Sequence, residues 1–414
     1  MGSLPLDALQ PGMILAEDLH GPDGKMLLPK GMVLTDSHIQ SLRTRGVLAA
    51  VIADGEAEEA GTPFDPELLA ACEAHVSPFF CANDPSHPVI ETLYALSVER
   101  LAASLVAGKP MPKDIAPSPR AESLGDLFFK AEGGAKDIVS SEVKLASFPD
   151  IYFKIRQVLD SPTSSTSQVA DVISKDTSLT AKLLKLVNSP FYGLPQRIDS
   201  ISRAVMVIGG QEISTLALGI SAINAFKDIP PELINMRTFW EHSVAVGSLA
   251  QVIGKHMRHG AGERLFVAGI LHDIGRLIIF KKLPHAAVEA IYYAKANQVA
   301  MVVAENEVLG FAHPQVGGLL LRAWKFPEAL VSLVACHHKP LTCPDPIEPS
   351  ILHLADLIAV AVGLTPPASA IVPPLEPAAW SALGLAPEDL PDLVAEGLAQ
   401  VDAIIGAFFP SGKN

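Results

Sequence analysis

The sequence predicts a mainly α protein in which a small mixed α/β module precedes an all-α helical domain. Three observations predict this class. Hydrophobic residues make up 49% of the 414 residues and charged residues 18%, which is typical of a globular chain. From about residue 138 onward, apolar residues recur at helical spacing with short breaks. Strand-like runs separated by Pro/Gly turns are convincing only near the N-terminus.

Residues 1–54 form the predicted mixed module. Its apolar runs are short and are divided by Gly, Pro and Asp, a pattern that favours hairpins over long helices. Thr35 is positioned to cap one short amphipathic helix. The expected elements are a turn and strand in 9–18, a turn at 21–24, a strand at 25–28, a helix following residue 35 and a closing strand at 47–52.

Residues 55–137 are predicted to be a helical connector. The acidic, Gly-rich stretch 55–63 indicates a linker, and helices are expected at 66–76 and 90–106. The stretch 107–120 is rich in proline, which cannot continue a helix, so a second linker is expected there.

The region 138–363 is predicted to be one all-α domain, followed by a Pro-rich segment and a C-terminal helix in 364–414. Within it, 138–233 holds no histidine, whereas 234–363 is histidine-rich. The expected helices are a segment ending near 160, then 165–174, 178–188, 201–208, 212–225, 239–257, 264–280, 284–297, 301–309, 314–324, 327–337, 350–362 and, after the Pro-rich segment, 387–408.

The charge pattern excludes some classes of partner. The net charge is −14, its acidic excess lies at the two ends of the chain, and no basic stripe for a DNA duplex is present. A small anionic ligand such as a nucleotide remains compatible with the nearly neutral middle. No apolar run reaches the roughly 20 residues of a membrane span, and the N-terminus lacks a signal-peptide pattern. The four cysteines show no close pairing, so we expect a cytoplasmic protein without membrane attachment.

The stretch 265–280 carries three polar residues in an otherwise apolar helix. These are His272, Asp273 and Arg276, all near its middle. A helix that is apolar all round is buried, and a buried carboxylate requires a partner. One alternative is an Asp–Arg ion pair with a hydrogen-bonded histidine. The other is a metal ion held by His272 and Asp273.

Two further isolated polar residues favour the metal. Nine of the thirteen histidines lie between residues 242 and 353. His242 is a polar residue in one otherwise apolar helix, and Asp356 is a polar residue in another. Metal sites in helical bundles are typically built from imidazoles and carboxylates that converge from separate helices. The alternative is a hydrogen-bonded core network without metal.

Several motifs occur in a fixed order along the helical domain. They are ISKDTSLTAKLLKLVNSPFYG at 173–193, SISRAVMVIG at 200–209, FWEHS at 239–243, FVAGILHD at 266–273, Glu307 followed by GFAH at 310–313, and ACHH at 335–338. Together they resemble the HDOD family of the HD phosphohydrolase superfamily. The resemblance covers roughly 138–363, and the first 54 residues resemble the small module attached to many HD-type signalling domains.

The resemblance implies an all-α signalling output domain in a bacterial protein. It implies that His242, His272, Asp273 and Asp356 bind one divalent metal ion, whether Fe, Mn, Mg, Ni or Zn. Ligands for a second metal are implied at His313, His337 and His338. If the protein is an enzyme, Asp273 and Arg276 are the expected catalytic residues, with Arg276 as the phosphate partner.

Two functions follow from this resemblance. The first is a signal-transduction module that acts on other signalling proteins. The second is a metal-dependent phosphohydrolase acting on a nucleotide or cyclic nucleotide, which the intact histidine and aspartate set favours. Cyclic-di-GMP hydrolysis is not expected, because Lys339-Pro340 follows the histidine pair where phosphodiesterases carry Glu and a Gly-Tyr-Pro segment.

Overall fold

The computed structural model separates the chain into two compact units, Met1–Ala70 and Ala71–Asn414. Each unit is described by itself. The structure describes residues 64–112, 126, 133–145, 150–161, 166–189, 192–223, 226, 229, 233–366 and 370–408, together with 2–10, 13, 15–17, 19–20, 26–28, 34, 39, 42, 47 and 49–52.

The first unit holds two short antiparallel strand pairs. Strand β1 (Gly2–Pro5) pairs with β4 (Ala49–Ile52), and β2 (Leu19–His20) pairs with β3 (Met26–Leu28). Strand β1 was not predicted, because its pairing partner is distant in sequence. The predicted helix following residue 35 lies largely outside the described residues. The core of this unit includes Leu15, Leu34 and Leu42, each 1% exposed.

The larger unit is helical in the described residues, which confirms the predicted mainly α class. Most helices fall where apolar spacing predicted them, and α4 and α18 are additional. The α-helices are α2 (Pro66–Val76), which begins in the first unit, α3 (Pro88–Val106), α4 (Ala135–Leu145), α5 (Asp150–Asp160), α6 (Thr166–Ser174), α7 (Thr177–Val187), α8 (Ile201–Ile208), α9 (Gly210–Ile223), α10 (Met236–His256), α11 (Gly262–Leu271), α12 (Ile274–Lys282), α13 (Pro284–Asn297), α14 (Met301–Leu309), α15 (His313–Ala323), α16 (Glu328–Cys336), α17 (Ile347–Ala361), α18 (Pro377–Leu383) and α19 (Leu390–Phe408).

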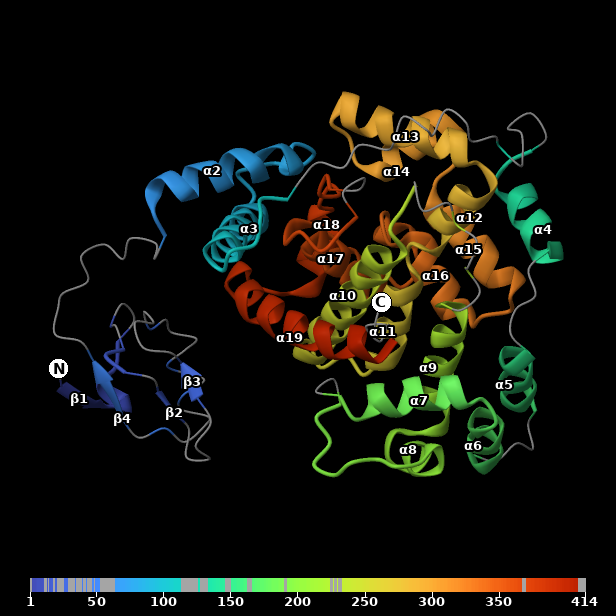
Figure 1. The fold of residues 1–414 in the computed structure, drawn as a ribbon, viewed down its shortest axis with the longest axis horizontal. Coiled ribbons are helices and arrows are strands. Elements are labelled where there is room, and N and C mark those ends of the chain that lie inside the picture. Colours follow the sequence, from blue (N-terminus) through green and yellow to red (C-terminus); the bar gives the residue numbers. More distant parts are fainter. Residues whose placement is uncertain are drawn as a thin grey trace. The chain divides into compact units, whose positions relative to one another are not determined.

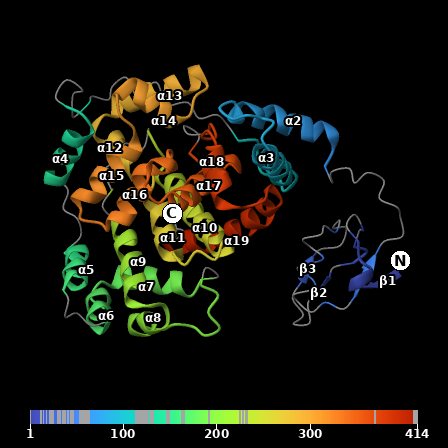
Figure 2. The ribbon, with the colours of Figure 1, turned by 180° about the vertical axis from the view of Figure 1, so that it is seen from behind.

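Helix α10 is the central element of this unit. It packs along α11, α17 and α19. Figure 1 shows α10, α11 and α17 in the middle, with α5 to α8 at one end and α13 and α14 at the other, and Figure 2 shows the same arrangement from behind. None of the described helices is both long enough and apolar enough to cross a membrane.

The prediction of one continuous helix over 264–280 is wrong. Helix α11 ends at Leu271 and α12 begins at Ile274, so His272 and Asp273 form a break between them. The His272 Nδ1 lies 2.6 Å from the Gly269 carbonyl, which caps the end of α11. The Arg276 N–H donates to the Asp273 carbonyl at 2.9 Å, which starts α12 with a tighter turn.

Two glycine contacts let the helices on both sides of this break approach their neighbours closely. A Cβ atom on Gly269 would clash with the backbone nitrogen of Gly247, where α11 crosses α10. A Cβ atom on Gly275 would clash with the carbonyl oxygen of His313, where α12 crosses α15. Because both obstacles are backbone atoms, side-chain rotation cannot relieve either clash. The two crossings bring α10 and α15 to opposite sides of the break at His272.

We predict that Gly269→Ala strongly destabilises the larger unit. Forcing a methyl group into this contact is expected to lower the free energy of unfolding by about 3 kcal/mol. Gly406→Ala is the matched control, since Gly406 is an exposed glycine in α19 with no atom near its added Cβ. The control should be neutral or stabilising by up to about 1 kcal/mol. Chemical denaturation followed by circular dichroism measures both, and equal effects would contradict the close crossing.

Candidate metal centre

The structure brings all seven predicted metal ligands to one place. They come from five helical elements: His242 from α10, His272 and Asp273 from the break before α12, His313 from the start of α15, the histidine pair from the end of α16, and Asp356 from α17. Three overlapping groups have ligand atoms within 4.8 Å of one another. These groups are His242, His272 and Asp273; His313, His337 and His338; and His272, His337 and Asp356.

The first group surrounds His242. Its Nε2 lies 3.2 Å from the His272 Nε2 and 3.3 Å from the Asp356 Oδ1. The Asp273 Oδ2 lies 3.8 Å from the His242 Nε2 and 3.7 Å from the His272 Nε2. All four side chains are at most 5% exposed.

The second group uses the other oxygen of the same aspartate. The His313 Nε2 lies 3.0 Å from the Asp273 Oδ1 and 3.3 Å from the His337 Nε2. His338 completes the group, and its Nδ1 lies 3.9 Å from the Asp356 Oδ2. Asp273 therefore faces one group with each carboxylate oxygen and lies between them.

Backbone and carboxylate acceptors fix the tautomers of four imidazoles. The His242 Nδ1 lies 2.7 Å from the Leu364 carbonyl, and the His337 Nδ1 lies 2.8 Å from the Val334 carbonyl. The His313 Nδ1 lies 2.6 Å from the Glu305 Oε2, and His272 bonds the Gly269 carbonyl in the same way. Because these oxygens can only accept, each Nδ1 carries a hydrogen, and in the neutral form of each ring the Nε2 presents a lone pair.

This arrangement fits metal ions, and without them lone pairs face one another in the neutral rings. The two Nε2–Nε2 distances, 3.2 and 3.3 Å, then join atoms that are both acceptors. Two ligands bound at about 2.05 Å to one tetrahedral ion lie roughly 3.3 Å apart. An acceptor on the other ring nitrogen is also the usual partner of a metal-ligating histidine. The donor set, imidazole nitrogen with carboxylate oxygen, suits divalent transition metals.

The charges around the centre also favour a cation. Burial by itself raises the pKa of Asp273, but Arg276, followed by His272 and His313, outweighs it and holds the pKa well below its usual range. For Asp356 burial is likewise outweighed, here by hydrogen bonds from His242 and His272, and its pKa is also held low. Burial lowers the pKa of His337 to about 3, so this imidazole is neutral. Burial also lowers the pKa of His272 and His313, but Asp273 and Asp356 outweigh it for His272 and Glu305 outweighs it for His313, so both pKa values are raised. The anionic carboxylates attract a cation, and a metal ion that binds here replaces the protons of these imidazoles.

Arg276 and Glu305 orient the ligands from outside. The Arg276 Nη1 lies 3.0 Å from the Asp273 Oδ2, so the predicted ion pair exists alongside the ligand cluster. Glu305 is 2% exposed and accepts hydrogen bonds from both the backbone N–H and the Nδ1 of His313. The sequence reasoning missed Glu305 and named Glu307, which is exposed. The helical spacing 301, 305, 309 places Glu305 on the buried face and could have identified it.

We predict that Glu305→Gln weakens metal binding while Glu307→Gln does not. The amide is a weaker acceptor than the carboxylate and removes the charge that holds the Nδ1–H of His313. Loss of such an orienting partner typically reduces metal affinity 10–100-fold. Competition with a chromophoric chelator measures the affinity. Glu307 is the matched control on the same helix, and equal affinities in the two variants would exclude this role for Glu305.

His353 is also part of the support. It is 2% exposed, and it lies one turn before Asp356 on α17. Its Nδ1 lies 2.8 Å from the His337 carbonyl, and its Nε2 accepts from the Glu376 N–H at 3.2 Å. It therefore ties the backbone of the histidine pair to the segment before α18.

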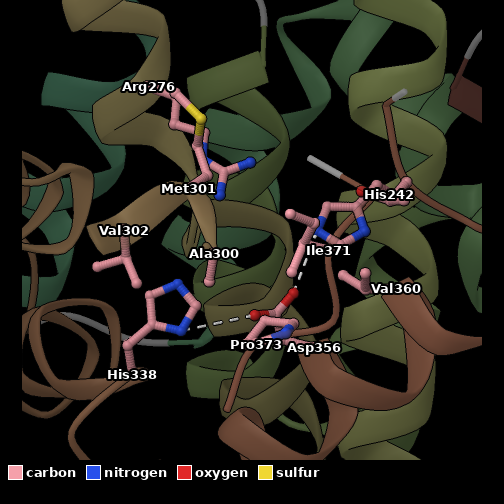
Figure 3. Close-up of a pocket in the computed structure, with 11 residues that line it drawn as sticks. His242, Arg276, Ala300, Met301, Val302, His338, Asp356, Val360, Ile371 and Pro373 are labelled. Atoms are coloured by element: carbon pink, nitrogen blue, oxygen red, sulfur yellow. Dashed lines mark ion pairs between the residues drawn. The ribbon is translucent and has the colours of Figure 1, made fainter. Parts of the chain in front are cut away.

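The approach to the centre is narrow. Figure 3 shows His242, Asp356 and His338 together with other residues that line the cavity, among them Met301 and Ile371. The cavity there measures about 10 Å³, which is room for roughly one water molecule. Cavities that bind small molecules are larger, commonly 300–1,000 Å³.

Comparison with known protein families finds a match that includes all the candidate ligands except Asp356. The family model described as the HDOD domain matches residues 145–340. An uncharacterized protein of Treponema pallidum is 23% identical over 216 residues, which are 51% of this chain and 41% of that relative. The chain thus spans less than half the length of that relative.

Solved structures share the fold. An HDOD domain protein with unknown function from Geobacter sulfurreducens has a TM-score of 0.53 and 21% identity, covering 67% of this chain and 98% of that one. A candidate phosphohydrolase from Shewanella amazonensis gives 0.52 and 23%, covering 66% and 98%. A candidate signal transduction protein from Marinobacter aquaeolei gives 0.50 and 19%, covering 75% and 72%.

Proposed function

We propose that the protein is a signal-transduction output module built around a two-ion metal centre, and the match of residues 145–340 to the HDOD domain model supports the signalling role. His242, His272, Asp273 and Asp356 hold one divalent ion, and His313, His337 and His338 hold the other. Asp273 lies between the two groups, with one carboxylate oxygen facing each, and would be shared by them. The domain acts on other signalling proteins, and the state of the metal centre sets the conformation that they bind.

The main support for this proposal is the two close pairs of Nε2 atoms, one in His242 and His272 and the other in His313 and His337. Each pair brings two Nε2 atoms to about 3.3 Å in a buried site, and the Nδ1 atom of each ring is held by an acceptor. With neutral rings and no metal ion, these contacts would be repulsive, and burying unsatisfied polar atoms costs about 1–3 kcal/mol for each group. A core network retained only for packing would be expected to hydrogen-bond internally instead. Metal ions account for all of these contacts at once.

The narrow cavity favours the signalling role over catalysis. A cavity of about 10 Å³ admits a water molecule but not a nucleotide phosphate. Metal-loaded protein is therefore expected to show no hydrolysis of bis(4-nitrophenyl) phosphate, nucleotides or cyclic nucleotides above that of Asp273→Ala. Turnover that depends on Asp273 would contradict the signalling role as the sole function.

A phosphohydrolase is the second candidate, favoured by the position of Arg276. This residue lines the same cavity as the ligands His242 and Asp356 and pairs with the shared carboxylate of Asp273. When bound, a pair of divalent ions supplies an activated water and charge stabilisation for phosphoryl transfer. Arg276 would orient a phosphate oxygen, and the apolar cover would exclude bulk water.

Shortening the Met301 side chain, which lines the cavity, distinguishes between these two functions. Met301 is 6% exposed over the centre, whereas Val303 on the same helix is 39% exposed. If a covered active site exists, Met301→Ala is expected to raise hydrolysis of bis(4-nitrophenyl) phosphate at least tenfold, and Val303→Ala to leave it unchanged. No turnover from a metal-loaded Met301→Ala protein would exclude the hydrolase.

A further inference from the structure

Two flanks of the chain border the narrow cavity above the metal ligands. One flank is the start of α14, where residues 300–302 line the cavity. The other is the segment 371–376, called the cover segment below, from which Ile371 and Pro373 line it (Figure 3). Three of the candidate ligands line the same cavity. An ion that reaches them through this cavity must therefore pass between the two flanks.

Asn83 binds the cover segment through both ends of its side-chain amide. Its Nδ2 donates to the Val372 and Pro373 carbonyls, each at 3.1 Å, and its Oδ1 accepts from the Leu375 N–H at 2.8 Å. The Phe79 carbonyl adds a fourth hydrogen bond, from the Val372 N–H at 2.8 Å. Both amide hydrogens and the amide oxygen are thus in use. The cover segment forms no helix or strand, so its path depends on bonds of this kind.

The same corner of the chain also contacts the other flank. Cys81 lies two residues before Asn83, and its thiol donates a weaker hydrogen bond to the Gln298 carbonyl at 3.3 Å. Gln298 ends α13 in a left-handed backbone conformation, two residues before the flank at 300–302. The corner at residues 79–83 therefore joins both flanks of the cavity by hydrogen bonds.

The far end of the cover segment is tied to the metal centre. The His353 Nε2 accepts from the Glu376 N–H at 3.2 Å, and the His353 Nδ1 lies 2.8 Å from the His337 carbonyl. In the middle of the cover segment, Val372 is 0% exposed and adds an apolar anchor. Removing the Asn83 bonds is therefore expected to let the cover segment open more often without detaching it.

We propose that Asn83 keeps the mouth of the metal centre closed and thereby sets the rate at which metal ions enter and leave. It acts through the cover segment, so it is a positioning residue. No candidate ligand lies in the cover segment, so opening it should speed entry and exit alike and leave the affinity nearly unchanged. The effect on metal exchange rests on the function proposed above, whereas the closure itself does not.

Metal exchange is tested on the Zn²⁺-loaded full chain with the chromophoric chelator 4-(2-pyridylazo)resorcinol. Asn83→Ala is expected to release Zn²⁺ at least about tenfold faster than the wild type, because three hydrogen bonds are lost. The dissociation constant, measured by competition with the same chelator, should change less than about threefold. Unchanged release, or faster release that is explained entirely by weaker affinity, would overturn the proposal.

Asn188→Ala is the matched control for loss of a similar structural amide. The Asn188 Nδ2 donates to the Leu184 and Ile198 carbonyls, and its Oδ1 accepts from the Ile198 N–H, all at 2.7 Å. Asn188 lies in the histidine-free half of the domain, so its loss should lower stability without changing the release of Zn²⁺. Equal acceleration by Asn83→Ala and Asn188→Ala would mean that general destabilisation, and not the cover segment, controls release.

A second variant guards against misfolding of Asn83→Ala. Asn83→Asp keeps the acceptor for the Leu375 N–H but faces the Val372 and Pro373 carbonyls with a carboxylate that cannot donate. It is expected to release Zn²⁺ at least about fivefold faster than the wild type. Wild-type release from folded Asn83→Asp would show that the two donated bonds do not keep the mouth closed.

The closure is tested without metal by amide hydrogen exchange in the metal-free protein. Asn83→Ala is expected to speed exchange of the Val372 and Glu376 amides at least about fivefold, and Asn188→Ala to leave both unchanged. Unchanged exchange in Asn83→Ala would overturn the closure. Faster exchange in a protein that binds no Zn²⁺ would support the closure and contradict the metal centre, so the two failures are distinguishable.

Discussion

Replacing Asp273 by alanine is expected to reduce bound metal from about two ions per chain to nearly none. One oxygen of Asp273 faces the Nε2 of His242 and His272, and the other lies 3.0 Å from the Nε2 of His313. A single substitution therefore removes a ligand from both ions. The loss should exceed that caused by His338→Ala, because His338 belongs to one group only. Elemental analysis of the purified proteins measures the metal content.

A second substitution separates loss of metal from loss of fold. Asp273→Ala also leaves Arg276 without its carboxylate partner, and breaking a buried ion pair costs about 3–5 kcal/mol. Asp273→Asn keeps the size of the side chain and should lose metal with a smaller loss of stability. Asp171→Ala, at an exposed position on α6, is the control. Full metal content in folded Asp273→Asn would show that Asp273 is not a ligand.

Removing metal from the wild type is expected to lower its melting temperature by about 5–16 °C. An ion present at 100 to 1,000 times its dissociation constant stabilises the folded state by about 2.7–4.1 kcal/mol. One kcal/mol corresponds to about 2–4 °C in a domain of this size class. The candidate ligands come from five segments of the larger unit. Repulsion between them in the metal-free protein is therefore expected to destabilise the packing of all five segments. Differential scanning calorimetry before and after dialysis against a chelator gives the shift.

Adding metal back and comparing different metals complete this test. Returning Zn²⁺, Mn²⁺ or Fe²⁺ to the dialysed protein should restore the original melting temperature, and the metal with the largest effect identifies the preferred ion. Asp273→Asn should melt at the same temperature with and without the chelator. A wild-type melting temperature that does not respond to chelation would mean that metal does not stabilise this fold.

Much of the fold, and the residues that meet at the candidate metal centre, could be predicted from the sequence for a physical reason. A charged or polar residue alone in an apolar helix must find a partner, so His242, Asp273 and Asp356 were conspicuous. Helical spacing located most of the helices. The resemblance to HDOD domains supplied His313, His337 and His338, which spacing by itself would have left as helix termini.

Other features depend on tertiary contacts that leave little trace in the local sequence. The residues on both sides of His272 are equally apolar, and the break before Asp273 accompanies the close crossing at Gly275. The partner of His242 is the backbone carbonyl of Leu364, so no side chain marks it. Strand β1 pairs with a segment more than forty residues away, which a local pattern cannot specify.

Anomalous X-ray scattering from metal-loaded crystals tests the central claim most directly. With data collected on both sides of the absorption edge of the bound metal, we expect two peaks. One should lie against the Nε2 atoms of His242 and His272, and the other against those of His313 and His337, with Asp273 between them. A hydrogen-bonded His–Asp network without a peak, or a peak away from these residues, would contradict a two-ion centre.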